Sequence, residues 1–205
     1  MTFSIKEALL FGWHKTRLHS GLLFKILITL FALMVAQELV SVVLKQSVIG
    51  FLAVFALTVA QFVAGVGLVL VTLRIAQGRH ASYENIVPPL QTLWQYAVAH
   101  LLAGLIILLG LILLIVPGIY FIIRFSMVRF LVLEGAGIKG SLKKSGELTE
   151  GIKWQLLGFL IVLCLVNLLG LLFFFVGLLV TIPVSMIAYA HVYQKLHTHH
   201  HTHKA

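Results

Sequence analysis

The charged side chains that could carry chemistry are few, and two of them interrupt long apolar stretches. Glu38 and Arg124 each lie about six residues from the predicted outer end of a helix, which is roughly 9 Å along its axis. These matching depths predict a Glu38–Arg124 ion pair in the outer half of a helix bundle, with Gln37 and Tyr120 as hydrogen-bond partners. A buried ion pair can fix helix register or line a transport site. We favour the register role, because buried charges are also retained as packing devices.

Three neutral polar residues, Gln61, His100 and Asn167, also fall inside apolar stretches. Each could line a polar cavity, or it could form a hydrogen bond that holds two neighbouring helices together. We favour the interhelical bond, because each of these residues is isolated and uncharged.

The carboxyl-terminal tail contains the most obvious group of metal-ligand side chains, namely His197, His199, His200, His201 and His203. Neutral imidazoles bind Zn, Ni or Cu. No Cys or carboxylate accompanies them, so we do not expect a folded structural metal site and favour a disordered basic terminus. The sequence therefore predicts no cofactor and leaves these histidines as weak candidates for metal ligands.

Catalytic motifs are missing from the chain. It contains no Asp, which removes the aspartate-based mechanisms of many lipid transferases, intramembrane proteases and ion pumps. It also lacks H-E-x-x-H, G-x-S-x-G and the phosphate-binding G-x-x-x-x-G-K-[ST]. The single cysteine, Cys164, lies in an apolar stretch and is expected to pack as a small hydrophobic side chain. These absences predict that the protein is not an enzyme.

The apolar stretches define the elements that must position these residues. The chain is 60% hydrophobic and only 10% charged, whereas soluble domains are about 45–50% apolar and about 25% charged. Residues 85–123 and 154–194 contain no Lys, Arg, Asp or Glu. Either run as one helix would span about 60 Å, twice the hydrocarbon core of a bilayer. Each run must therefore cross a membrane twice, with turns at Pro117-Gly118 and at 170–177.

We predict an all-α polytopic membrane protein with six transmembrane helices arranged as three helical hairpins. The predicted spans are 21–44, 48–73, 95–116, 119–133, 155–169 and 177–193. The whole chain, 1–205, forms a single integral membrane domain. Its parts are an interfacial segment (1–20), the first hairpin (21–73), an interfacial segment with the second hairpin (82–133), an interfacial segment with the third hairpin (138–195), and a His-rich tail (196–205).

Each hairpin is preceded by a polar segment that places a tryptophan next to the first span: Trp13, Trp94 and Trp154. Tryptophan is enriched at the depth of lipid headgroups. In the first segment, Ile5, Leu9 and Trp13 repeat every four residues, which predicts an amphipathic helix lying on the inner leaflet. The three segments form a weak internal repeat, or a coincidence, since interfacial tryptophans occur in any membrane protein.

Basic residues predict the orientation of the chain. There are 15 Lys and Arg against 6 Asp and Glu, and their excess favours an anionic membrane surface over nucleic acid as the partner. The connections and ends on one side carry Lys6, Lys15, Arg17, Arg74, Arg79, Lys139, Lys143, Lys144, Lys153, Lys195 and Lys204, and the other side carries Lys45 alone. Positive segments stay in the cytoplasm. We therefore predict a multi-pass protein of the bacterial inner membrane with both termini cytoplasmic.

Several short motifs resemble those of a known family. They are Ile115-Val-Pro-Gly-Ile-Tyr120, Arg124-Phe-Ser126, Lys144-Ser-Gly-Glu-Leu-Thr149, Gly151 and Trp154. Over residues of about 95–195 the chain resembles the YciC-like bacterial inner-membrane proteins and the membrane region fused to some glycerophosphodiester phosphodiesterases. The resemblance implies six helices. It implies no activity, because the family lacks an agreed one and no phosphodiesterase domain is present here.

Two functions follow from these observations as alternatives. The first is a non-enzymatic membrane protein that organises lipid, or a partner membrane protein or a second copy of itself. In that case Lys139, Lys143, Lys144 and Lys153 engage anionic headgroups at about 1 kcal/mol each. The second is a small transporter or channel, whose polar cavity would be lined by Glu38, Gln61, His100, Arg124 and Asn167.

Overall fold

The computed structural model describes residues 3–44, 47–172 and 177–202, and within them every regular element is a helix. The all-α prediction is therefore confirmed for this part of the chain. The helices are α1 (Ile5–Leu18), α2 (Ser20–Val43), α3 (Val48–Ala76), the short 3-10 helix η1 (Tyr83–Ile86), α4 (Leu90–Leu113), α5 (Ile115–Arg124), α6 (Val128–Leu133), α7 (Gly137–Leu148), α8 (Lys153–Leu172) and α9 (Leu178–Thr202). Lys45, His203 and Lys204, which were used in the predictions above, lie outside the described residues.

Five helical segments of the described chain are long and apolar enough to cross a membrane. They are Ser20–Val43, Val48–Ala76, Leu90–Leu113, Ile115–Leu133 and Lys153–Leu172. Five of the six predicted spans are thereby matched in length and composition, the fourth of them as two consecutive helices, α5 and α6. The sixth predicted span falls within α9, which is not among the five. The second half of α9 carries His191, Gln194 and Lys195, and these side chains lower the mean hydropathy of the helix.

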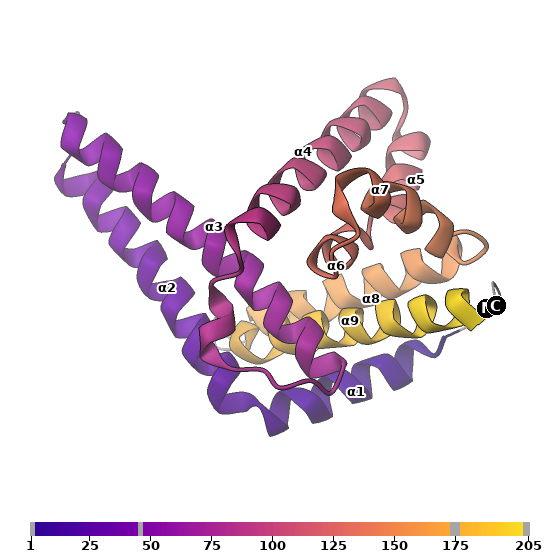
Figure 1. Cartoon of the computed structure of the whole chain (residues 1–205). Helices are drawn as coiled ribbons and strands as arrows, with labels where there is room; N and C mark the ends of the chain where they lie inside the picture. The colour runs from indigo at the N-terminus through magenta and orange to yellow at the C-terminus, as the bar shows by residue number, and fades with distance from the viewer. Residues whose placement is uncertain (1–2, 45–46, 173–176, 203–205) are drawn as a thin grey trace.

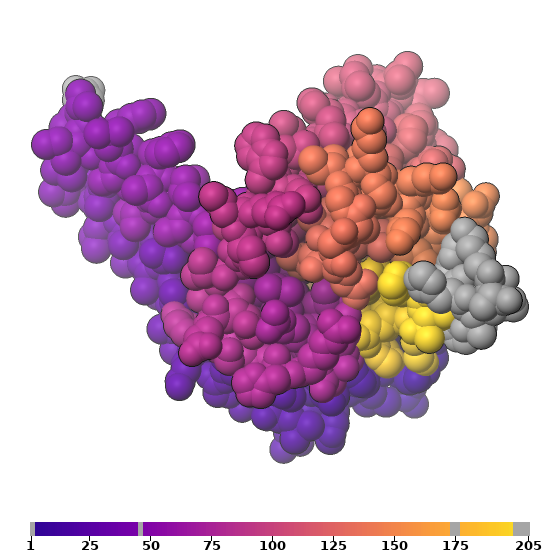
Figure 2. All heavy atoms as spheres, viewed as in Figure 1, coloured from indigo at the N-terminus to yellow at the C-terminus, as the bar shows by residue number. Residues whose placement is uncertain are grey.

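The helices form two arms that extend from a common base. In Figure 1, α2 and α3 lie side by side as the first arm, and α4 with α5 forms the second. The base contains α1, α6, α8, α9 and the carboxyl-terminal end of α3, which share one core, and α9 packs against α1, α3 and α8. Figure 2 shows the tip of the first arm standing clear of the rest of the molecule. Consecutive helices with short connections thus pack together. Helices α1 and α9 also pack against each other, although they lie at opposite ends of the sequence.

The turn of the second arm comes at Leu114, whose backbone is extended (φ −166°, ψ 151°). The prediction of a turn at Pro117-Gly118 places it too late in the chain. Both residues instead lie in the first turn of α5, where the missing N–H of proline leaves no helical hydrogen bond unmade. Gly118 lets α5 approach α4 closely, because a Cβ atom there would lie 2.3 Å from Leu111 Cδ2.

Helix α1 packs against α9 through small side chains. Ala8, Gly12 and Thr16 are buried along one side of α1. A Cβ atom on Gly12 would lie 2.4 Å from the Val184 carbonyl oxygen, so any larger residue would push the two helices apart. Ser4 fixes the start of the helix, because its side chain accepts a hydrogen bond of 3.3 Å from the Glu7 N–H.

This packing corrects the prediction for residues 1–20. The face formed by Ile5, Leu9 and Trp13 was expected to rest on a lipid leaflet. In the structure Ile5 and Leu9 are partly buried against the core of the base, and only Trp13 is open, with 48% of its surface exposed. The small residues on the adjacent side of α1 decide the outcome, since they allow a helix–helix contact that the apolar repeat does not reveal.

Aromatic residues fill the core of the base. Phe130, Phe159 and Tyr193 are fully buried there. Tyr189 joins them, with its ring edge-on to Phe130 at 5.3 Å. Its hydroxyl donates a hydrogen bond of 2.8 Å to the Ser126 carbonyl oxygen. The base is therefore a packed core in its own right.

Candidate lipid groove and polar pocket

The predicted ion pair between Glu38 and Arg124 does not form. Among the described residues the ion pairs are Lys195–Glu7 and His197–Glu134. Glu38 is exposed on the first arm, whereas Arg124 is exposed at the last residue of α5 and lies beside Gly146 of α7. The matching depths were misleading because α5 is short and ends at Arg124, next to α7, on a different arm from Glu38.

Two of the neutral polar candidates hold neighbouring helices together, as favoured above. The Gln61 side-chain amide donates to Gln37 Oε1 at 2.5 Å, which ties α3 to α2. The Asn167 amide donates to Ser185 Oγ at 2.9 Å, which ties α8 to α9. These bonds occupy the donors that a polar transport cavity would need.

His100 takes neither of its two expected roles. Its Nδ1 atom lies 3.0 Å from the carbonyl oxygen of Tyr96, one turn earlier in the same helix. Its ring also stacks on the Tyr96 ring at 4.0 Å. Both of these contacts are made with Tyr96 of the same helix, and no hydrogen bond from His100 to another helix is present among the described residues.

An apolar groove lies between α5 and α8, with a volume of about 400 Å³. We refer to it as the α5–α8 groove. It is lined by Val116, Ile119, Tyr120, Ile123, Lys153, Trp154 and Leu157. Its one charged lining residue, Lys153, donates a hydrogen bond of 3.0 Å to the Tyr120 hydroxyl and stands 4.2 Å from the centre of that ring. The groove thus combines apolar walls with a cation.

A second cation, Arg124, reaches the same tyrosine. Its Nη1 atom lies 3.5 Å from the Tyr120 hydroxyl. Neither Arg124 nor Lys153 has a carboxylate within ion-pair distance among the described residues. Two like charges that share one neutral oxygen favour an anion between them.

Helix α7 presents the remaining predicted lysines next to this site. Its Ser145 hydroxyl donates to the Arg124 carbonyl oxygen at 2.7 Å and accepts from the Met127 N–H at 3.2 Å, which anchors α7 to the end of α5. With Ser145 buried, Lys139, Lys143 and Lys144 are exposed on the outer side. Helix α7 thus has the buried and exposed sides expected of an amphipathic helix, and its location at the membrane interface stays a prediction.

The three tryptophans are all open at the surface. Trp13, Trp94 and Trp154 are 48%, 68% and 86% exposed, respectively. Trp154 lines the α5–α8 groove, and Trp13 lines a smaller cavity of about 180 Å³ beside Pro183. Their exposure leaves the indole rings available for contact with lipid.

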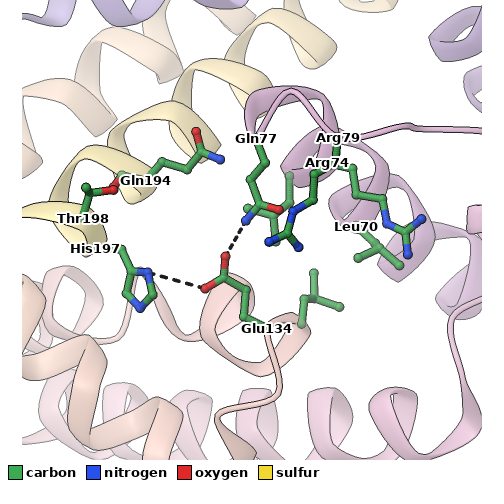
Figure 3. Close-up of a pocket in the computed structure, with 10 residues that line it drawn as sticks. Leu70, Arg74, Gln77, Arg79, Glu134, Gln194, His197 and Thr198 are labelled. Carbon is green, nitrogen blue, oxygen red and sulfur yellow. Dashed lines mark hydrogen bonds and ion pairs between the residues drawn. The ribbon is translucent and has the colours of Figure 1, made fainter. Parts of the chain in front are cut away.

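A larger cavity of about 680 Å³ lies where the ends of α3, α6 and α9 meet. We refer to it as the polar pocket (Figure 3). It is lined by Leu70, Leu73, Arg74, Gln77, Arg79, Leu133, Glu134, Gln194, His197 and Thr198. The sequence carries no signal for this pocket beyond two basic residues in a connection, because its polar residues come from three distant segments with no shared motif.

Glu134 is the centre of the polar pocket. Its carboxylate accepts a hydrogen bond of 2.5 Å from the Gln77 amide and another of 2.5 Å from the Tyr193 hydroxyl. His197 Nδ1 lies 3.7 Å from Glu134 Oε2. In the orientation that satisfies both its amide atoms, Gln194 donates to the Ala76 carbonyl oxygen and accepts from the Gln77 N–H, each at 2.9 Å. These bonds fix the end of α3 against α9.

The histidine tail gives no metal site among the residues described. No group of three His, Cys, Asp or Glu side chains comes close enough to hold a metal ion in that part of the chain. His197 faces Glu134 instead. The side chains of His199, His200, His201 and His203 lie outside the described set, so their predicted role as weak metal ligands stays a prediction.

No protein-family model matches the chain, and no curated protein and no solved structure matches it. The likeness to YciC-like membrane proteins therefore stays a prediction. A fold by itself does not identify an activity, so the chemistry of the groove and of the pocket indicates the function.

Proposed function

We propose that this protein is a non-enzymatic integral membrane protein that binds and organises anionic phospholipid at the cytoplasmic face of the bacterial inner membrane. The observation that carries the proposal is the α5–α8 groove, whose apolar walls have Lys153 and Arg124 beside a common tyrosine. An acyl chain would occupy the groove, and the lipid phosphate would lie between the two cations.

Energetics favour an anionic lipid over a neutral one at this position. Each basic group near a membrane surface contributes about 1 kcal/mol toward anionic lipid. The apolar walls add contact with the chain, and Trp154 can pack at headgroup depth. Lys139, Lys143 and Lys144 lie outside the groove, so we expect them to attract anionic lipid in a diffuse and salt-sensitive manner.

The proposal includes six spans, with α9 as the sixth, and a cytoplasmic location for both termini. Contacts between the predicted cytoplasmic segments support it. Lys195 pairs with Glu7 at 2.5 Å, and Gln194 bonds the end of α3. Segments predicted to lie on one side of the membrane thus meet in space, and α8 packs against α9 as two antiparallel spans would.

The apolar surfaces of the arms add a second role for lipid or for another membrane protein. In the first arm, Phe31, Phe51 and Phe55 are 60%, 73% and 62% exposed, respectively. Such surfaces need lipid, a partner membrane protein or a second copy of the chain around them. The transporter alternative has less support, because Gln61 and Asn167 are used in interhelical bonds and the three cavities described above are not lined by the predicted transport residues.

The decisive test is lipid retention by the protein in nanodiscs, measured by native mass spectrometry. In Lys153→Gln we expect retention of phosphatidylglycerol to fall about fivefold, the equivalent of about 1 kcal/mol. Retention of phosphatidylcholine should not change. Leu157→Trp, which fills the groove, should reduce retention of both lipids.

The matched control is Lys143→Gln on the outer side of α7. It should leave the retained lipid unchanged at high salt, because it removes only diffuse attraction. Equal phosphatidylglycerol retention by wild type, Lys153→Gln and Leu157→Trp would overturn the proposal.

A further inference from the structure

The polar pocket is lined by basic, acidic and neutral polar side chains from the ends of three helices, together with apolar side chains. Figure 3 shows Arg74 and Gln77 extending from the end of α3 toward Glu134, with Gln194 and His197 facing them from α9. Leu70, Leu73 and Leu133 are the apolar lining residues. The pocket is therefore a polar site in a chain that is otherwise mostly apolar.

Glu134, the one acidic residue among those that line the pocket, already has hydrogen-bond and ion-pair partners. Glu134 accepts bonds from Gln77 and Tyr193 and pairs with His197. Its side chain is only 23% exposed. A carboxylate that is held in this way by α3 and α9 acts as a structural centre that fixes the shape of the pocket.

The two arginines of the pocket are not neutralised in the same way. Neither Arg74 nor Arg79 forms an ion pair among the described residues, although Glu134 lines the same cavity. Arg74 is half-buried and Arg79 is exposed. The nearby carboxylate is engaged by other residues, so the cavity carries two guanidinium charges without an ion pair among the described residues.

We propose that the polar pocket binds a phosphate-bearing anion through Arg74 and Arg79. Guanidinium groups match the geometry of phosphate oxygens with two parallel N–H donors, whereas an ammonium group offers only a point charge. The volume of about 680 Å³ exceeds that of a phosphate group alone and leaves room for an attached polar group.

This site is distinct from the one proposed above. The α5–α8 groove is apolar and uses Lys153 and Arg124, whereas the polar pocket uses residues of α3, α6 and α9. Basic pockets between membrane helices can receive the phosphate of a lipid headgroup. A free phosphorylated compound offers the same chemistry, so the experiment needs one arm for each source.

The test is a titration of the full chain in nonionic detergent with inorganic phosphate, at ionic strength held constant with chloride. We expect a saturable rise in Tm for the wild type, because a ligand that binds only the folded state stabilises it. Arg74→Gln and Arg79→Gln should each weaken the apparent Kd at least about tenfold, which is within the range for a lost charge-assisted hydrogen bond.

A matched variant separates this proposal from general charge effects. Lys143→Gln removes one exposed cation outside the pocket and should titrate as the wild type does. Arg79→Gln also guards against misfolding, because Arg79 is exposed and follows the end of α3. Unchanged phosphate affinity in both arginine variants, or the absence of any saturable effect in the wild type, would overturn the proposal.

The second arm identifies the source of the phosphate group. The same titration is made in nanodiscs of phosphatidylglycerol and in nanodiscs of phosphatidylcholine. A lipid headgroup in the pocket would compete with phosphate, so phosphate should bind more weakly in phosphatidylglycerol nanodiscs than in phosphatidylcholine nanodiscs. If Arg79→Gln removes this difference between the two lipids, the pocket is assigned to a lipid headgroup. Equal binding in both assigns it to a free phosphorylated compound.

Discussion

The base and the first arm are built from the same kinds of residue but have opposite surroundings. Phe159 is fully buried in the base, whereas Phe55 on the arm is 62% exposed. The helical backbone of each is hydrogen-bonded internally, so the difference lies in the side chains. The base supplies its own core, while the arm leaves large apolar side chains exposed.

Polar side chains differ between the two regions in the same way. In the base they extend across several helices, as in the bonds of Glu134 to Gln77 and Tyr193. In the first arm, Gln61 bonds only to its neighbouring helix, α2. Polar side chains therefore join α3, α6 and α9 in the base, whereas the Gln61 bonds of the first arm join only α2 and α3.

The largest expected effect comes from truncating an aromatic side chain of the base. Phe159→Ala removes a ring that packs edge-on against Phe3 at 5.5 Å and tilted against Tyr189 at 6.0 Å. It should lower the free energy of unfolding in detergent by about 3–5 kcal/mol. The matched variant Phe55→Ala should change it by no more than about 0.5 kcal/mol. Equal losses in the two variants would remove the distinction between base and arm.

A smaller effect is expected from the interhelical amide pair that Gln61 and Gln37 form in the first arm. Gln61→Leu removes the donor to Gln37 and should cost about 0.6 kcal/mol, the average for a hydrogen bond between membrane helices. Thr58→Val is the control, because the Thr58 hydroxyl bonds only the Val54 carbonyl oxygen of its own helix. Unfolding in mixed micelles followed by circular dichroism measures both. A loss in the free energy of unfolding for Gln61→Leu that exceeds the loss for Phe159→Ala would mean that the arm has a core of its own.

The smallest effect concerns the contact between α1 and α9. The hydrogen bond and charge of Lys195 lower the pKa of Glu7 below its ordinary value of 4.5. A carboxyl group with a lowered pKa in the folded state stabilises it above the unfolded pKa, and this contribution is lost as pH falls through the folded pKa. Both side chains are partly exposed, so the effect should be small.

The corresponding measurement is the Tm difference between wild type and Glu7→Gln as a function of pH. The difference should be present at pH 7 and vanish in acid, below the lowered pKa of Glu7. Lys195→Gln should show the same loss and the same pH dependence. A Tm difference that persists unchanged in acid would show that Glu7 acts through packing and not through its charge.

Much of the fold was predictable because it depends on local composition. The uncharged run 85–123 contains most of α4 and α5, as expected from its length. The amphipathic segment at α7 was also predictable, because the exposed lysines and the buried Ser145 follow helical periodicity. The interhelical roles of Gln61 and Asn167 followed from the cost of leaving an amide without a partner in an apolar stretch.

The predictions that were wrong or incomplete concern contacts between residues far apart in the chain, or the exact position of a turn. The Glu38–Arg124 pair was inferred from two depths, and depth along a helix does not state which helices are neighbours. The turn at Pro117-Gly118 was placed by residue type, although proline fits the first turn of a helix equally well. The polar pocket was missed because Glu134 has no apparent partner until α3 and α9 meet.

The sequence by itself determined that the described chain is helical, that several of its segments are long and apolar enough to cross a membrane, and that its basic residues gather in a few connections. These properties depend on composition and on short-range periodicity. The tertiary structure decided that Gly12 brings α1 against α9, that Lys153 and Arg124 share Tyr120, and that Arg74 faces the pocket around Glu134. Such contacts join residues far apart in the chain, and they depend on how side chains of particular sizes pack together.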